Sequence, residues 1–500
     1  MNRRLVRRVW GGLLAASLAL IVGALGFVSG RWHAQGAPRD AAPAGEAPVS
    51  GAMAPPGTAA SAGATRPAPP SNAPASQAGP DSSRGYLTTP AELREIGAKA
   101  RRGDEPIAGH VAVVLEFAAE PWDFALRRVE RCEDSNTPAW NDNDGGTRIL
   151  YAKALAYHLT GNPGYAAEVS AALERIMTEV QAITLDEQQC RLNFAWGTPE
   201  LVASADLIED HWRGQECAGP TGTRYQDTTI GRGSCKTLFQ NWLVKNPYYV
   251  VSLAADNSQS NWGAAATTTL AHIADYLSDR PEVTLIARRQ PTPGQAQIEE
   301  VAQTPREAYS HANRLALDRM NGYRTELMSR FSCDLLAGEQ QHERWAPVKS
   351  QITENGIIPE DARREMSCNV PSYNGEYQNY PQIHLGNLVQ QCELMLRRGD
   401  SSCYDNVEWT DIPEYRYIGP DGKPRTTHLR AGRGSVERAI AAVIIDGGAE
   451  WRHDDALAVA YSYYVNNHRL PGIERWAAQI DRQTRCGQSI CFGRLTHSSP

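Results

Sequence analysis

The stretch Thr147–Val180, TRILYAKALAYHLTGNPGYAAEVSAALERIMTEV, decides the fold class. Its apolar residues recur every three to four positions, which is the spacing of an amphipathic helix. The pattern breaks at Gly161-Asn162-Pro163, where a helix-ending glycine precedes a proline suited to the first turn of a new helix. The stretch therefore predicts two helices joined by a tight turn.

Helix-start signals recur along the rest of the chain. In Thr89-Pro90-Ala91-Glu92, a threonine N-cap, a first-turn proline and a glutamate form the pattern of a capping box. Thr198-Pro199-Glu200-Leu201 begins like a second Thr-Pro-x-Glu start, although its glutamate directly follows the proline. Further helical patterns cover residues 235–246, 256–279, 381–398, 435–445 and 454–469, and alternating strand patterns are scarce. We expect one all-α domain over residues 85–500, an (α/α) toroid or incomplete barrel of helical hairpins whose loops at one end build the site.

The residues before this domain predict a targeting or membrane-anchoring segment followed by a flexible linker. Residues 1–8 are arginine-rich, and residues 9–30 carry no charge and are long enough to cross a bilayer. An uncleaved transmembrane anchor and a cleaved signal peptide both fit this pattern. Residues 31–84 are rich in Ala, Pro, Gly and Ser and predict a disordered linker. We expect a periplasmic domain anchored to the inner membrane, or a soluble periplasmic or secreted one after cleavage.

Ten cysteines in an exported chain predict disulfides. The pairs that close the shortest loops are Cys217–Cys235, Cys392–Cys403 and Cys486–Cys491. The sequence holds no CxxC pair and no two histidines four residues apart, so zinc is not favoured. A net charge of −7 and a pI near 6.0 argue against a nucleic-acid partner but leave room for an acidic polysaccharide in a locally basic cleft.

Five stretches resemble, in order, motifs of the alginate lyase superfamily of polysaccharide lyases. They are LTTPAELREIGAKARRGDEP, CEDSNTPAWNDNDGGTRILYAKALAYHLTGNPGYAAE, LNFAWGTPELVASADLI, FQNWLVKNPYYVVSLAADNSQSNW and NGEYQNYPQIHLGNLVQQCELMLRRGD. The resemblance covers roughly residues 85–480. It implies the family's (α/α) toroid and cleavage of a uronate polysaccharide, alginate or a related one, by β-elimination. It implies no metal and no coenzyme.

β-Elimination explains a cluster of uncharged amides in the fourth stretch. Removal of the proton at C5 spreads negative charge onto the neighbouring carboxylate, and donors aimed at its oxygens stabilise that charge. The resemblance assigns this role to Asn257 and Asn261, with Gln259 as a third donor and Trp262 as a stacking surface for a sugar ring.

The chain departs from the family where the family has Asn-Asn-His, because Ser258 and Gln259 leave no histidine there. A literal Asn466-Asn467-His468 lies near the C-terminus, and we interpret it as a helix end.

The acid and base must then come from YNGEYQNYPQIH, residues 373–384. Counting back from Arg398-Gly399 at the helix end, the family's catalytic position falls on Tyr380. The local sequence YQN, which resembles a Tyr-His-Asn triplet, favours Tyr377 instead. His384, one helical turn later, either assists or belongs to the core.

Other polar and aromatic residues are weaker candidates for the same site. Arg364 and Arg363 would neutralise acid groups or lower the pKa of the tyrosine, unless they form a solvated basic turn. Asn141 and Asn143 would contact sugar from a loop that turn chemistry explains equally well. Trp196 is a candidate stacking platform or an ordinary core aromatic residue.

Two other classes of function remain open from the sequence. A glycoside hydrolase on a similar toroid would need two carboxylates, for which Asp142, Asp144 and Glu360 are available. A non-catalytic exopolysaccharide-binding protein of the cell envelope would fit the missing histidine. In each case we expect a monomer that binds an acidic polysaccharide.

Overall fold

The computed structural model describes a set of segments that all belong to the unit Gln77–Pro500. The described residues are 85–124, 126, 130, 145–185, 188–258, 260–289, 297–321, 380–405, 408–418, 424–433, 436–441, 451, 454–467, 474–480 and 489–497. The predicted segments 1–8, 9–30 and 31–84 therefore lie outside the described residues. Among the helices that are described, none is long and apolar enough to span a membrane.

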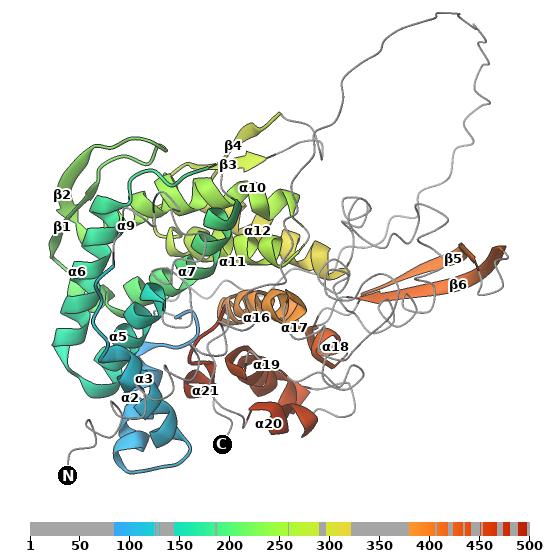
Figure 1. Ribbon diagram of the computed structural model, residues 1–500, viewed down its shortest axis with the longest axis horizontal. Coiled ribbons are helices and arrows are strands. Elements are labelled where there is room, and N and C mark those ends of the chain that lie inside the picture. The colour runs from blue at the N-terminus through green and yellow to red at the C-terminus, as the bar shows by residue number, and fades with distance from the viewer. Residues whose placement is uncertain are drawn as a thin grey trace, which may run out of the picture. The chain divides into compact units, whose positions relative to one another are not determined.

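The described part of the chain is mainly helical, as the sequence predicts for an all-α protein (Figure 1). The helices of the N-terminal half are α2 (Pro90–Arg101), α3 (Ile107–Ala118), α5 (Gly146–Thr160), α6 (Pro163–Glu179), α7 (Gln188–Leu207), α8 (Glu209–Trp212), α9 (Cys235–Leu243), the π-helix η1 (Val244–Tyr248) and α10 (Tyr249–Asn257). Those of the C-terminal half are α11 (Asn261–Tyr276), α12 (Pro305–Asn321), α16 (Tyr380–Arg397), α17 (Ser402–Asp405), α18 (Val436–Ala441), α19 (Asp454–Asn467), α20 (Glu474–Ile480) and α21 (Gly493–Thr496).

Three antiparallel two-stranded hairpins accompany the helices. They are β1 (Glu216–Pro220) with β2 (Ile230–Ser234), β3 (Leu285–Arg289) with β4 (Glu299–Gln303), and β5 (Glu408–Ile418) with β6 (Pro424–Arg433). Apolar alternation does not mark the first two pairs. The β3–β4 register places Arg288 opposite Glu300 and Arg289 opposite Glu299, so that cross-strand charge pairs support it. Because these strands lack an alternation of apolar and polar residues, the sequence pattern did not predict the hairpins.

The two predicted local signals at the N-terminal end of the domain are confirmed. The Thr89 hydroxyl accepts a hydrogen bond from the Glu92 amide at 3.2 Å, and the Glu92 carboxylate accepts one from the Thr89 amide at 2.7 Å. Between α5 and α6, Gly161 adopts a left-handed φ of 73° and the Asn162 side chain caps α6 through the Gly164 amide. The capping box and the Gly-Asn-Pro break therefore end and start these helices as expected.

The helix start predicted at Thr198-Pro199-Glu200 is wrong, because α7 begins at Gln188 and passes through Pro199. Proline has no amide hydrogen, so the carbonyl of Ala195 loses its partner within the helix. The Thr269 hydroxyl of α11 donates to this carbonyl at 2.5 Å instead, at a position where both residues are buried. A contact with a distant segment thus allows a proline inside a buried helix.

Glu200 is likewise a buried side chain rather than a capping residue. The Thr147 hydroxyl donates to its carboxylate at 2.5 Å, and the Arg148 guanidinium lies 3.6 Å from the other oxygen. Burial raises the pKa of the Glu200 carboxyl, and the neighbouring Arg148 and Thr147 act against that rise. This cluster holds the start of α5 against the middle of α7.

Four helices, α5, α7, α11 and α16, pack side by side in chain order and run in the same direction (Figure 1). From α5 to α7, Thr147 contacts Glu200 and His158 contacts the carbonyl of Leu207. From α11 to α16, Thr268 donates to the carbonyl of Asn387, and Arg398 just beyond α16 binds Asp275 at 2.6 Å. In each pair the residue numbers increase together, so the helices are parallel.

The α7–α11 pair follows the same rule. Thr269 of α11 contacts Ala195 of α7, and the Asp206 carboxylate farther along α7 acts electrostatically on Tyr276 near the end of α11. The intervening segments, including α6 and α12, return the chain to the starting end. All four helices therefore have their N-terminal ends at the same end of the helical layer.

Two of the three predicted disulfides are confirmed. Cys217–Cys235 joins β1 to the start of α9, and Cys392–Cys403 joins α16 to α17. Cys190 and Cys491 are also disulfide-bonded, and no free thiol occurs among the described cysteines. Cys486, the predicted partner of Cys491, lies outside the described residues.

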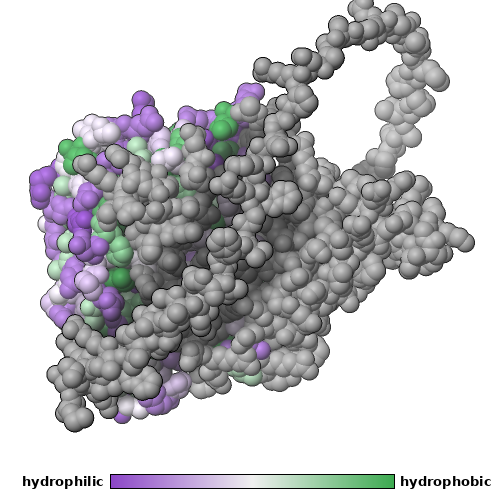
Figure 2. All heavy atoms as spheres, in the orientation of Figure 1, coloured by the Kyte–Doolittle hydropathy of each residue, from purple (hydrophilic) through white to green (hydrophobic). Residues whose placement is uncertain are grey.

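The coloured surface in Figure 2 is mainly hydrophilic, with small apolar patches between the polar residues. Within the described part, only two large apolar side chains are well exposed, Ile230 at 40 % and Ile298 at 43 %. Neither belongs to a helix. The helices accordingly direct their apolar faces into the core.

Candidate functional site

The predicted amides lie at the junction between α10 and α11. Asn257 is the last residue of α10 and is exposed, whereas Asn261 is the first residue of α11 and is only 1 % exposed. Ser260 is the N-cap of α11, because its hydroxyl accepts a hydrogen bond from the Trp262 amide at 3.4 Å. The N-cap of α11 is therefore Ser260, between the two asparagines.

Trp262 is partly buried and packs against the hydrophobic core. Gln259, the third predicted donor, lies outside the described residues.

Tyr380 is the first residue of α16 and packs, partly buried, against the core. Since α16 runs parallel to α11, Tyr380 lies at the same end of the helical layer as Asn261. The sequence predicts a helix over residues 381–398, and α16 begins one residue earlier, at Tyr380. Of the other two residues predicted from neighbouring helices, His384 on α16 is 1 % exposed and Trp196 on α7 is 8 % exposed.

The remaining predicted residues cannot be located in the same way. Those that lie outside the described residues are Tyr377, Arg363, Arg364, Asn141 and Asn143, together with the carboxylates considered for a hydrolase, Asp142, Asp144 and Glu360. Asn467 is the exposed last residue of α19. Its position agrees with the interpretation of Asn466-Asn467-His468 as a helix end.

Arg319, near the end of α12, holds the α10–α11 junction in place and had no signal in the sequence. Its side chain is 3 % exposed. It donates to the carbonyls of Ser258, at 3.1 Å, and of Ala255, and to the Thr267 hydroxyl at 2.5 Å. One guanidinium therefore binds the end of α10, the connecting residues and the first turns of α11, which positions the segment that carries the two asparagines.

A second group of charged residues begins at Asp256, next to Asn257. The His311 Nε2 atom lies 3.2 Å from one Asp256 oxygen and 3.3 Å from the other, and the Arg289 Nε atom lies 3.3 Å from Asp256. On its other side, His311 Nδ1 lies 2.8 Å from an Arg314 nitrogen.

This arrangement fixes the state of the His311 ring. Arginine can only donate, so Nδ1 must accept from Arg314, and the ring hydrogen then resides on Nε2 and is donated to Asp256. With both nitrogens engaged, His311 acts as a link between Asp256 and Arg314. It does not replace the histidine that the Asn-Ser-Gln stretch lacks.

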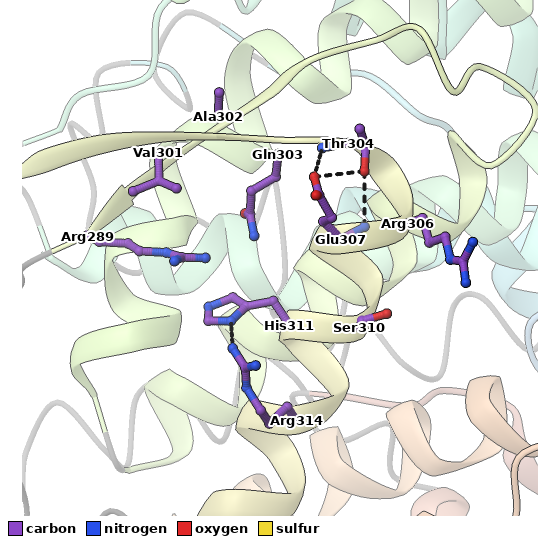
Figure 3. A pocket seen from close by; sticks show the side chains of 10 residues that line it. All are labelled: Arg289, Val301, Ala302, Gln303, Thr304, Arg306, Glu307, Ser310, His311 and Arg314. Atoms are coloured by element: carbon purple, nitrogen blue, oxygen red, sulfur yellow. Dashed lines mark hydrogen bonds between the residues drawn. The ribbon is translucent and has the colours of Figure 1, made fainter.

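His311 and its arginines line a hollow of about 660 Å³ beside the β3–β4 hairpin and α12 (Figure 3). The charged and amide residues that line it are Arg289, Gln303, Arg306, Glu307, His311 and Arg314. The Glu307 carboxylate caps α12 by accepting from the Thr304 amide at 2.8 Å and from the Thr304 hydroxyl at 2.9 Å. This hollow could not be predicted from the sequence, because Asp256, Arg289 and Arg314 belong to three separate elements, α10, β3 and α12.

Comparison with models of known protein families found no match, and comparisons with curated proteins and with solved structures found none either. Within the described segments, no group of three or more His, Cys, Asp or Glu side chains is placed to hold a metal ion.

Proposed function

We propose that this protein is a polysaccharide lyase that cleaves a uronate-containing acidic polysaccharide by β-elimination. The observation that carries the proposal is the parallel packing of α11 and α16, which brings the amide pair and Tyr380 to the same end of the helical layer. These are the residue types that the reaction needs, a neutral donor for the carboxylate and a proton carrier.

The layer of parallel helices, with returning segments such as α6 and α12 between them, also supports an incomplete (α/α) toroid as the fold. In such a fold the loops at one end of the layer form the substrate cleft. The exposed Asn257 lies at this end, next to the N-terminus of α11.

In the proposed reaction the Asn257 amide donates to the uronate carboxylate, and Asn261 supports the same segment. Tyr380, as the phenolate, takes the proton from C5 and becomes a neutral phenol. The C4–O4 bond then breaks as a double bond forms between C4 and C5, and a proton returns from Tyr380 to the leaving O4 oxygen. Donors already in position stabilise the charge that develops on the carboxylate. Such electrostatic stabilisation is usually the largest single contribution to catalysis.

The location of the enzyme follows from the same proposal. A periplasmic enzyme held by the N-terminal segment at the inner membrane would meet an acidic exopolysaccharide on its way out of the cell. Residues 31–84 would supply the tether.

One assay separates a lyase from the two alternatives. The full-length protein is incubated with alginate and with glucuronan, and both the ultraviolet absorbance of unsaturated ends and the number of new reducing ends are followed. A lyase produces both signals. New reducing ends without absorbance identify a hydrolase, and the absence of both, with retained polymer binding, identifies a binding protein.

Variants then connect the activity to the site. We expect Asn257→Ala to lower kcat by about 10²–10³-fold, the usual effect of losing one preorganised donor. Tyr380→Phe should lower it further, because the ring remains but the proton carrier is lost. Tyr165→Phe on α6, which removes a hydroxyl far from the proposed cleft, is the matched control.

A further inference from the structure

The lining of the hollow beside α12 includes none of Asn257, Asn261 and Tyr380, and its side chains suit an anion. In Figure 3, Arg289, Gln303 and Arg314 point toward His311, whereas Arg306 points away from it. The side chains come from β3, β4 and α12. We propose that this hollow binds the carboxylate of an acidic sugar residue.

Charge is the first support for this assignment. Arg289 and Arg314 face the hollow, and the Glu307 carboxylate on its lining accepts both Thr304 hydrogen bonds through one oxygen, Oε2. Asp256, behind His311, balances part of the charge of Arg289. Arg314 contacts His311 and is exposed, so its positive charge is available to an anion in the hollow.

The geometry of the donors is the second support. Arg289 meets Asp256 through Nε, and Arg314 meets His311 through one terminal nitrogen, so each guanidinium keeps further N–H groups for another acceptor. The Gln303 carbonyl oxygen accepts from the Tyr248 hydroxyl at 2.9 Å, which orients the Gln303 amide nitrogen as a donor. Two guanidinium groups and an amide then surround a space where a planar carboxylate can accept from several donors.

The backing of the hollow is the third support. Asp256, His311 and Arg314 form a hydrogen-bonded row, and Asp256 also meets Arg289. The position of each arginine is therefore set before a ligand arrives. Such preorganisation reduces the entropy lost on binding.

The identity of the sugar rests on the proposed function, whereas the recognition of an anion does not. A second carboxylate site outside the cleft would hold another unit of the same polymer, or another chain, while elimination proceeds at the amide pair. It would raise the local concentration of substrate without taking part in the reaction.

The test uses methyl glucuronide, which carries a carboxylate and has no glycosidic bond at O4 to eliminate. Its binding to the full-length protein is followed by NMR titration, with the His311 ring signals as the local probe. Methyl glucoside is the neutral control. We expect saturable shifts of the His311 signals with the glucuronide only.

Arg314→Gln should weaken the binding of the glucuronide on the order of tenfold, the effect of losing one charge-assisted hydrogen bond. Arg314→Lys should weaken it less, because it keeps the charge. The double variant Arg94→Gln/Arg213→Gln removes two exposed arginines elsewhere and should leave the affinity unchanged. Thermal unfolding curves check that each variant is folded.

Three results would overturn the proposal: glucuronide shifts that Arg314→Gln does not affect, equal shifts with methyl glucoside, or equally strong binding of inorganic sulfate. Failure of the lyase assay has a different signature. If polymers are not cleaved but the glucuronide still binds through Arg314, the anion site stands and only the proposed reaction falls.

Discussion

Arg319 offers the sharpest test of how the candidate site is held. The variant Arg319→Met keeps an unbranched side chain of similar length but removes every donor of the guanidinium. The buried carbonyls of Ala255 and Ser258 and the Thr267 hydroxyl then lose their bonds to this side chain. Each of the two carbonyls that loses a buried donor costs about 1–3 kcal/mol. We therefore expect the free energy of unfolding to fall by roughly 2–6 kcal/mol.

The assay is urea unfolding of the full-length protein followed by circular dichroism. The midpoint should shift while the slope with denaturant stays the same, because the surface exposed on unfolding changes little. Arg306→Met is the matched control, since Arg306 lies on the same helix but is exposed. Its effect should stay within about 0.5 kcal/mol.

Function should follow stability in this case. Because Arg319 positions the segment between α10 and α11, Arg319→Met should also lower elimination activity under conditions where the protein is still folded. A stability loss below about 1 kcal/mol would refute the reasoning, since it would mean that other contacts hold the junction. Arg319→Lys should fall in between, because one ammonium group cannot reach all three acceptors.

Three further predictions concern pH, a disulfide and the catalytic tyrosine. Burial lowers the pKa of His272 from 6.5 to about 4, so its neutral form stabilises the fold above pH 6.5 and this contribution is lost as the pH falls toward 4. Unfolding at several pH values should show about 3 kcal/mol of this loss in the natural protein and not in His272→Gln. Replacing both Cys217 and Cys235 by alanine should lower the free energy of unfolding by about 3 kcal/mol, as expected for a closed loop of this length; thiol labelling and mass spectrometry check that the pair is oxidised. In the elimination assay, a variant Tyr380→Phe with near-normal kcat would shift the catalytic role to Tyr377.

The local elements could be predicted because their signals lie within a few residues of one another. Thr89 and Glu92 cap the same turn, and Gly161 and Asn162 end one helix and begin the next. The helix start predicted at Thr198 is wrong because the Ala195 carbonyl, which Pro199 leaves without a donor in the helix, is bound by Thr269, 74 residues from Ala195 along the chain. A Thr-Pro pair in the sequence predicts a helix start, and only the tertiary structure shows the distant hydroxyl that replaces the missing amide donor.

The candidate site was only partly predictable for the same reason. The asparagines and Tyr380 stand at helix ends, where sequence patterns are informative. Arg319 and His311 lie inside an amphipathic helix that gives no hint of their roles, because their partners, Ala255 and Asp256, belong to α10. Their roles follow from tertiary packing alone.

The shared direction of α5, α7, α11 and α16 has an electrostatic consequence. Each helix carries a macrodipole equivalent to about half a positive charge at its N-terminus. The positive ends of these four helices lie at the end that holds Asn261 and Tyr380, whereas the returning helices α6 and α12 direct their N-termini to the opposite end. The first turns of α11 and α16 therefore favour a negatively charged group close to Asn261 and Tyr380, the two residues that begin these helices.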